Sequence, residues 1–115
     1  MNKTYQQFLK ENSGKTAVYT FGRFNPPTIG HEKLLRVVDT TSKKEGGDYF
    51  VYTSHSQDSK KNPLSHKQTI NFLKLIFSKH RPYIEDSTAT TALHAASDIY
   101  DKGGYSKLVM VVGSD

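Results

Sequence analysis

Short β-rich runs alternate with amphipathic helical segments along most of the chain, and this alternation restricts the fold more than any other feature. The β-rich runs cover residues 17–21, 49–53 and 108–112, with a shorter run around residues 83–84. Apolar residues at helical spacing predict helices over residues 28–45, 65–77 and 87–100 between them. Continuous apolar strands separated by helices are typical of a parallel sheet that is covered on both faces. The sequence therefore predicts an α/β fold, a Rossmann-like three-layer α/β/α domain with four to five parallel strands.

The length of 115 residues suits one domain over residues 1–115, in which residues 1–14 form a leading helix or arm. The most apolar run, residues 108–112, is followed by only three residues. A strand of that kind normally leads into a further helix. We therefore expect the chain to be part of a longer enzyme whose C-terminal part is missing here. A missing C-terminal helix would expose apolar surface of the sheet, and such surface favours a homo-oligomer.

Composition excludes several classes of chemistry. The absence of cysteine excludes disulfides, thiolate metal sites and cysteine nucleophiles. No apolar run approaches the roughly 18 residues that a membrane span requires, and no export signal opens the chain, so we expect a cytoplasmic protein without a membrane partner. The histidines outside the motif described next show no metal-ligand spacing, and His66 and His94 are expected on helix surfaces. No metal-ligating residue is predicted.

The net charge of +5 favours anionic partners. The basic residues are spread along the sequence, with no block of five or six, so a small phosphorylated ligand suits the charge as well as a polynucleotide does.

The most specific segment is TFGRFNPPTIGH, from Thr20 to His31. A β-rich run leads through a glycine and a proline-containing loop into the start of a helix, where free N–H groups and the positive end of the helix dipole favour anions. Gly22 and Gly30 permit close approach of a phosphate. Thr28 is suited to capping the helix, and His31 follows within its first turn. The sequence therefore predicts a phosphate-binding loop.

The same segment resembles the Thr/His-x-Gly-His signature of the nucleotidylyltransferase superfamily. Its Gly-Arg-Phe-x-Pro opening is similar to archaeal nicotinamide-mononucleotide adenylyltransferases, and its Thr-x-Gly-His end to phosphopantetheine adenylyltransferases. Residues 60–65 resemble the family's lysine-containing loop, and residues 111–115 its Gly-x-Asp strand end. The amino-acid sequence of residues 15–115, including the Ser-Gln-Asp stretch at 56–58, is most similar to nucleotidyltransferase-like bacteriophage proteins. This resemblance implies that the protein is located in a host cytoplasm.

The resemblance implies transfer of AMP or CMP from ATP or CTP to a small phosphorylated acceptor, with Mg²⁺ accompanying the nucleotide and pyrophosphate leaving. It also implies the nucleotidylyltransferase variant of the Rossmann-like fold. By resemblance, His31, Thr28 and Lys61 act on the reacting phosphates, and Lys60 and Asn62 belong to the substrate loop. The residues implied in nucleotide or phosphate binding are Phe21, Gly22, Arg23, Phe24, Asn25, Gly30, Gly113 and Asp115.

Two other classes of function stay open. The family's late Ser/Thr-rich phosphate motif does not occur in residues 1–115, which fits a catalytically weakened nucleotide-binding module. The isoelectric point near 9.4 fits a nucleic-acid-binding domain, although the basic residues are not interleaved with exposed aromatics. The sequence names neither the acceptor nor the base of the nucleotide.

Overall fold

The computed structural model describes residues 14–56, 60 and 62–113, so the predicted leading helix or arm lies almost wholly outside the described residues. The described elements are, in chain order, β1 (Lys15–Gly22), α2 (Ile29–Lys44), β2 (Asp48–Thr53), α3 (His66–Ile76), the 3-10 helix η1 (Ser78–Tyr83), β3 (Ile84–Glu85), α4 (Ala92–Lys102) and β4 (Tyr105–Met110). This order confirms the predicted alternation of strands and helices.

The four strands form one sheet in the order β3-β2-β1-β4, and each neighbouring pair is parallel. Along β1, Ala17 pairs with Asp48 and Gly22 pairs with Thr53, so β1 and β2 end level with each other. On the other side of β1, Tyr19 pairs with Met110. Ligands of open parallel sheets bind at this carboxyl edge of the strands.

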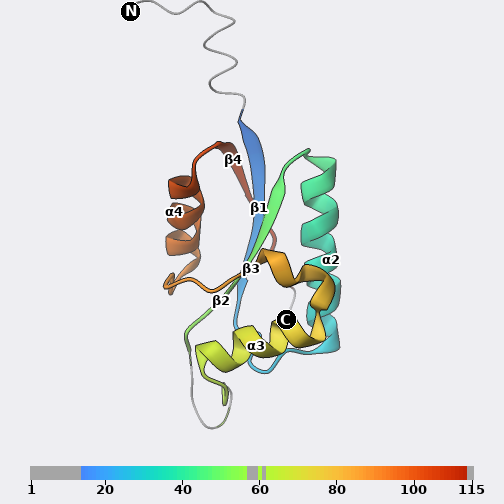
Figure 1. Cartoon of the computed structure of the whole chain (residues 1–115), viewed down its shortest axis with the longest axis vertical. Helices are drawn as coiled ribbons and strands as arrows, with labels where there is room; N and C mark the ends of the chain where they lie inside the picture. Colours follow the sequence, from blue (N-terminus) through green and yellow to red (C-terminus); the bar gives the residue numbers. More distant parts are fainter. Residues whose placement is uncertain (1–13, 57–59, 61, 114–115) are drawn as a thin grey trace, which may run out of the picture.

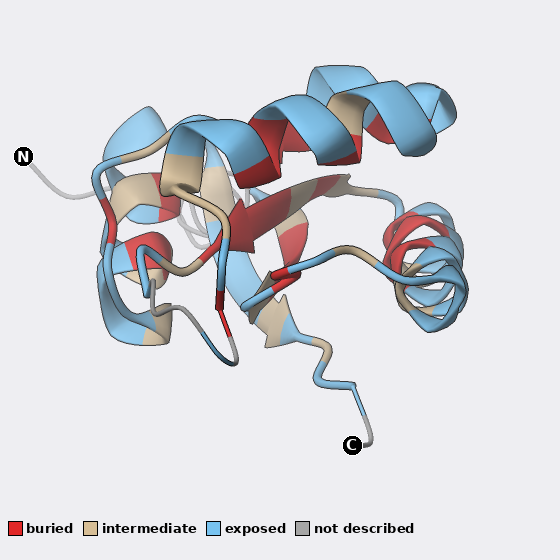
Figure 2. Cartoon of the chain, turned by 90° about the horizontal axis from the view of Figure 1, so that it is seen from below, coloured by how far each residue is buried: buried red, intermediate tan, exposed pale blue. Residues whose placement is uncertain are grey.

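Helices cover the sheet on both faces, as Figures 1 and 2 show. Leu35 and Val38 of α2 and Leu73 of α3 pack with Val18 and Val51 of the sheet in one core. On the opposite face, Ala95 and Ile99 of α4 pack against sheet residues such as Tyr52 in a second core. The predicted three-layer α/β/α architecture with a parallel sheet is confirmed. None of the helices in the described parts of the chain combines the length and apolar character needed to cross a membrane.

Local sequence signals explain where two of the helices begin and end. α3 begins at a capping box in which the Gln68 amide donates to the Ser65 hydroxyl and the Ser65 amide donates to the Gln68 side chain. α2 ends just before Gly46, whose φ of 67° lies in the left-handed region that glycine adopts without steric cost. Gly47 has no room for a side chain, because a Cβ there would lie 1.8 Å from the Thr16 carbonyl oxygen. The predicted start of α3 and the break after α2 are both confirmed.

Two predicted boundaries were wrong. The helix expected to start after Ser87 or Thr88 begins at Ala92, because Thr91 provides the cap and its hydroxyl accepts a hydrogen bond from the His94 amide (3.0 Å). The final strand covers Tyr105–Met110 instead of residues 108–112.

The last strand also differs from expectation in its position. Because β4 lies at the edge of the described sheet, its side chains are not covered on both faces. Leu108 and Met110 are 41% and 39% exposed, and Val112, just beyond the strand, is 70% exposed. An apolar run in the sequence indicates that a strand is suited to burial. The position of the strand in the sheet decides whether its side chains are in fact buried.

Candidate functional site

A cleft of about 1090 Å³ opens at the carboxyl edge of the sheet, between the end of β1, the residues after β4 and the first turn of α2. This volume is slightly above the range of about 300–1,000 Å³ that is usual for small-molecule sites. The predicted residues that line it are Phe21, Gly22, Arg23, Phe24, Asn25, Thr28, Gly30, His31, Asn62 and Gly113. The fold thus brings ten residues of the sequence prediction to one place.

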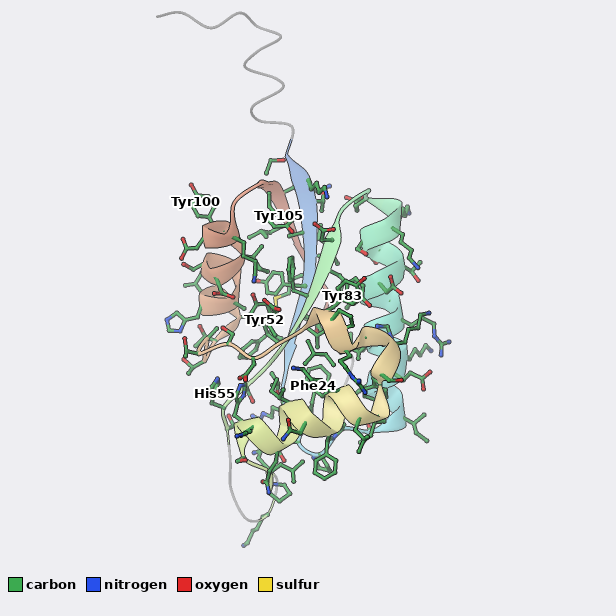
Figure 3. All side chains as sticks on the ribbon, in the orientation of Figure 1. Phe24, Tyr52, His55, Tyr83, Tyr100 and Tyr105 are labelled. Carbon is green, nitrogen blue, oxygen red and sulfur yellow. The ribbon has the colours of Figure 1, made fainter. Side chains whose placement is uncertain are left out.

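Phe24 sets the shape of the loop between β1 and α2. Its side chain is 2% exposed and its φ is 47°, a left-handed conformation that costs a non-glycine residue about 1 kcal/mol. Its ring meets the His31 ring edge-on, with centroids 4.8 Å apart. A Cβ on Gly22 would lie 3.1 Å from the Phe24 ring, so Gly22 makes room for Phe24 as well as lining the cleft. The loop is labelled at Phe24 in Figure 3.

Asn25 holds the same loop to the segment that follows β2. Its side-chain nitrogen donates to the carbonyl oxygens of Leu64 (2.7 Å) and Ser56 (3.2 Å), and its side-chain oxygen accepts from the Leu64 amide (2.8 Å). The side chain is buried, and these three bonds occupy most of its hydrogen-bonding capacity. The loop is further tied by the Thr53 hydroxyl, which donates to the Arg23 carbonyl oxygen (3.0 Å). Asn25 therefore positions the loop, and its place in the lining of the cleft leaves the role in nucleotide or phosphate binding that the resemblance implies as a prediction.

Thr28 and His31 are linked in a way that fixes the tautomer of the imidazole. The Thr28 amide donates to His31 Nδ1 at 2.9 Å, and the His31 amide donates to the Thr28 carbonyl oxygen at 3.0 Å. Because Nδ1 accepts this hydrogen bond, it carries no proton, and the proton of the neutral ring is on Nε2. His31 is thus a hydrogen-bond donor through Nε2 without needing a positive charge. A donor of this kind at a helix N-terminus suits a phosphoryl oxygen.

Gly30 is a glycine that the fold does not require. It is the second residue of α2, has a negative φ and is exposed, and a Cβ there would meet only the Thr28 hydroxyl oxygen, at the ordinary distance of 3.7 Å. Glycine inside a helix destabilises it by about 0.5–1 kcal/mol relative to alanine. The missing side chain leaves the first-turn backbone of α2 accessible from the cleft.

The charge of the cleft favours an anion. Arg23, His31 and Lys33 contribute basic or hydrogen-donating groups, and the described lining contains no carboxylate. Within the part of the chain that the structure describes, no three His, Asp or Glu side chains gather as a metal site. These donors do not fit a magnesium ion held by the protein itself, since that ion prefers carboxylate, phosphate and water oxygens. A magnesium ion compatible with this cleft is one that phosphate oxygens and water coordinate.

Several titratable groups with shifted pKa values lie in the hydrophobic layers. Burial lowers the pKa of His80, whose Nδ1 lies 2.8 Å from the Tyr49 hydroxyl. Burial and the hydrogen bond to Asp98 raise the pKa of Tyr52, which donates to that carboxylate at 2.6 Å. These polar pairs connect the sheet to its covering helices and turns and serve the fold.

Three predicted residues are not placed in the cleft. Lys60 is exposed and does not belong to the described lining, and Lys61 and Asp115 lie outside the described residues. Other lining residues were missed by the sequence analysis, among them Lys33, Val37, Ser54 and Thr90. Lys33 and Val37 follow Gly30 at the i+3 and i+7 positions of α2, so helical spacing was a usable signal for them. Ser54 and Thr90 come to the cleft only through the pairing of β2 and the path of the chain before α4.

Comparison with known proteins adds no relative. The chain matches no model of a known protein family, no curated protein and no solved structure. A functional assignment therefore depends on the motif and on the geometry of the cleft.

Proposed function

We propose that this chain is the nucleotide-binding domain of a nucleotidylyltransferase, which transfers AMP or CMP from a nucleoside triphosphate to a small phosphorylated acceptor. The observation that supports this most directly is the corner formed by Thr28, Gly30 and His31. It combines the N-terminus of a 16-residue helix, an uncovered backbone at Gly30 and an imidazole whose Nε2 is the donor. The resemblance to the family's Thr-x-Gly-His signature supports the same assignment.

In the proposed reaction, an oxygen of the acceptor phosphate attacks the α-phosphorus of the triphosphate. A new phosphorus–oxygen bond forms, the bond between the α-phosphorus and its bridging oxygen to the β-phosphate breaks, and pyrophosphate leaves with that electron pair. No covalent enzyme intermediate is needed. The protein has to align the two phosphates and stabilise the charge that develops on the α-phosphoryl oxygens.

The positions of the cleft residues support a separate role for each group of them in binding the triphosphate and the base. His31 Nε2–H and the first-turn amides of α2 donate to α-phosphoryl oxygens. Arg23 and Lys33 provide positive charge for the remaining phosphates. The apolar side chains of Val37 and Val112 in the lining offer a surface for a base or another flat group. Magnesium, when it accompanies the nucleotide, neutralises phosphate charge.

Binding of ATP and CTP in the presence of Mg²⁺, measured by calorimetry, tests the proposal. Replacing His31 with alanine removes a hydrogen bond to a charged group, worth about 1.5–3 kcal/mol, and we expect affinity to fall about 10- to 150-fold. Glu32→Ala is the matched control, because Glu32 lies in the same helical turn but not in the described lining of the cleft. It should bind as tightly as the parent chain or slightly more tightly. Equal binding by the His31→Ala variant, or no nucleotide binding by the folded parent chain, would contradict the proposal.

A further inference from the structure

The helix α3 carries apolar side chains on its outer side as well as on the side that faces the core. Ile70 and Leu73 are buried in the core beneath the helix. Phe72, Leu75 and Ile76 are 43%, 70% and 53% exposed. Leu75 and Ile76 follow Phe72 at the i+3 and i+4 positions, so both lie beside it on the helix surface. Single exposed apolar residues are ordinary, but adjacent large ones are typical of a surface that binds another molecule.

The chain around these apolar side chains is basic. Residues 62–84 contain four Lys and Arg residues and no Asp or Glu. Lys67 on α3 and Lys79 and Arg81 on η1 are exposed. Arg81 donates two hydrogen bonds to the carbonyl oxygen of Lys74 (3.3 and 3.4 Å), which hold its guanidinium group against the last turn of α3. These residues make up the α3 surface: Phe72, Leu75 and Ile76 with Lys67, Lys79 and Arg81.

The acidic residues that follow η1 in the chain have other partners. Glu85 is bound to Lys102 of α4 at 2.6 Å. Asp86 lies 3.5 Å from Nε2 of His66, the first residue of α3. The sequence analysis had expected His66 on a helix surface, but its ring stacks on that of His55, with centroids 3.6 Å apart, and its side chain is only 15% exposed. His66 is therefore not part of the α3 surface, and Glu85 and Asp86 do not neutralise the cations of that surface.

The helix α4 provides a comparison, because it also has exposed apolar side chains. Leu93 and Tyr100 of α4 are 79% and 75% exposed. The Asp and Lys residues of that helix are Asp98, Asp101 and Lys102, so its charge is mainly acidic. The two helices therefore form a matched pair, in which similar apolar groups are combined with cations on α3 and with carboxylates on α4.

We propose that the α3 surface attaches the chain to an anionic lipid bilayer, with its apolar side chains at the boundary between headgroups and acyl chains. Binding of this kind increases with the apolar area buried and with the attraction of cations to anionic lipids. Lys and Arg side chains place their apolar stems beside the inserted residues and their charged ends among the lipid phosphates. The sequence analysis expected no membrane partner because it found no span and no export signal, and attachment at a surface needs neither. The proposal does not require that the cleft bind a nucleotide.

Two other occupants fit the α3 surface less well. A second copy of the chain, bound through the same surface about a two-fold axis, would bring Lys67, Lys79 and Arg81 close to the same cations of its partner. A polynucleotide would satisfy the cations, but it is bound through its phosphates and through stacking on flat side chains. The aliphatic side chains of Leu75 and Ile76 contribute to neither contact. A lipid surface uses the apolar and the basic residues together.

Flotation of the full chain with lipid vesicles tests the proposal. Vesicles of phosphatidylcholine with about one third phosphatidylserine should bind the chain at least about tenfold more tightly than vesicles of phosphatidylcholine alone. Binding should weaken as the salt concentration rises to about 0.15 M, because the Debye length then shortens to about 8 Å. Absence of binding to the anionic vesicles at low salt, or equal binding to both kinds of vesicle, overturns the proposal.

Matched variants separate the α3 surface from general attraction of a basic protein. Leu75→Ser removes the most exposed apolar group of the surface and should weaken binding to anionic vesicles about tenfold. Leu93→Ser makes the same change on α4 and should bind like the parent chain. Lys67→Gln and Lys79→Gln should each weaken binding about fivefold. Lys44→Gln removes the same charge at the end of α2 farthest from α3 (Figure 1) and should change binding less than about twofold. Equal effects within either matched set overturn the proposal.

Two further measurements identify the other occupants. The first is binding of a single-stranded oligonucleotide. If the chain binds it through Lys67 and Lys79 without Leu75, and binds no vesicles, the surface belongs to nucleic acid and the proposal is overturned. The second is sedimentation velocity. A dimer that Leu75→Ser dissociates, in a chain that binds no vesicles, assigns the surface to a second copy and also overturns the proposal.

Discussion

Replacing Gly30 with alanine should change stability and ligand binding in opposite directions. The added Cβ meets only the Thr28 hydroxyl oxygen at 3.7 Å, an ordinary contact, so no steric cost opposes the substitution. The φ of Gly30 is one that alanine readily adopts in a helix. Alanine restricts the unfolded chain and favours the helix, which together should stabilise the fold by about 0.4–1 kcal/mol. For a domain of this size that corresponds to a rise in Tm of roughly 2–5 °C.

The same methyl group should impair binding of an anion at the start of α2. It projects from the first turn into the cleft, where a phosphate would contact the backbone amides. Loss of one hydrogen bond to a charged oxygen costs about 1.5–3 kcal/mol, so nucleotide affinity should fall about 10- to 150-fold.

Thermal unfolding followed by circular dichroism and calorimetric titration with Mg²⁺–ATP or Mg²⁺–CTP measure the two effects on one protein sample. Thr40→Ala is the control, because Thr40 is exposed on the same helix but does not belong to the described lining of the cleft. It should stabilise by a few tenths of a kcal/mol without changing affinity. If the Gly30→Ala variant is less stable than the parent chain, glycine at this position serves folding. If it is more stable and binds equally well, no phosphate approaches this backbone, and the reasoning about the corner is wrong.

Two further predictions concern the groups that hold the loop and the sheet. Asn25→Ala removes a buried side chain that makes three hydrogen bonds to the backbone of the half-buried Leu64 and the exposed Ser56, and it should destabilise the fold by about 1–3 kcal/mol in urea denaturation. An effect below about 1 kcal/mol would show that the clamp is dispensable. The Tyr105 hydroxyl donates to Asp48 at 2.7 Å, and burial together with this hydrogen bond raises the pKa of Tyr105 to about 12. The contribution of Tyr105 to stability is therefore present below pH 10 and is lost as the pH rises towards 12. Tyr105→Phe should lower stability by about 1 kcal/mol at neutral pH and flatten this part of the alkaline decline, and an unchanged alkaline decline in the variant would refute the assignment.

The sequence predicted the strands and helices well where one local pattern dominates. The run that ends at Gly22 is a strand, and the capping-box spacing at Ser65 opens a helix at the expected residue. At α4, four nearby Ser and Thr residues are all able to cap, and the residue chosen depends on how Ala95 and Ile99 meet the sheet. Local propensity does not resolve such a choice.

The candidate cleft likewise has features that the local sequence predicts and features that depend on tertiary contacts. The segment from Thr20 to His31 is continuous, so its strand–loop–helix form was predictable and brings most of its residues to one place. The work of individual side chains was not predictable. Asn25 is occupied by backbone groups about 30 and 40 residues away, and no pattern near it in the sequence indicates those partners.

The sequence by itself determined the order of strands and helices, the parallel character of the sheet and the anion-favouring start of α2. These properties depend on periodicity and on residue types that are neighbours in the chain. Only the tertiary structure decided that β4 lies at the edge of the described sheet, that Phe24 takes the space above Gly22, and that His55 stacks on His66. The physical reason is that each of these is a contact between groups whose neighbours are set by packing of the whole domain, where exclusion of water and steric fit outweigh local preference.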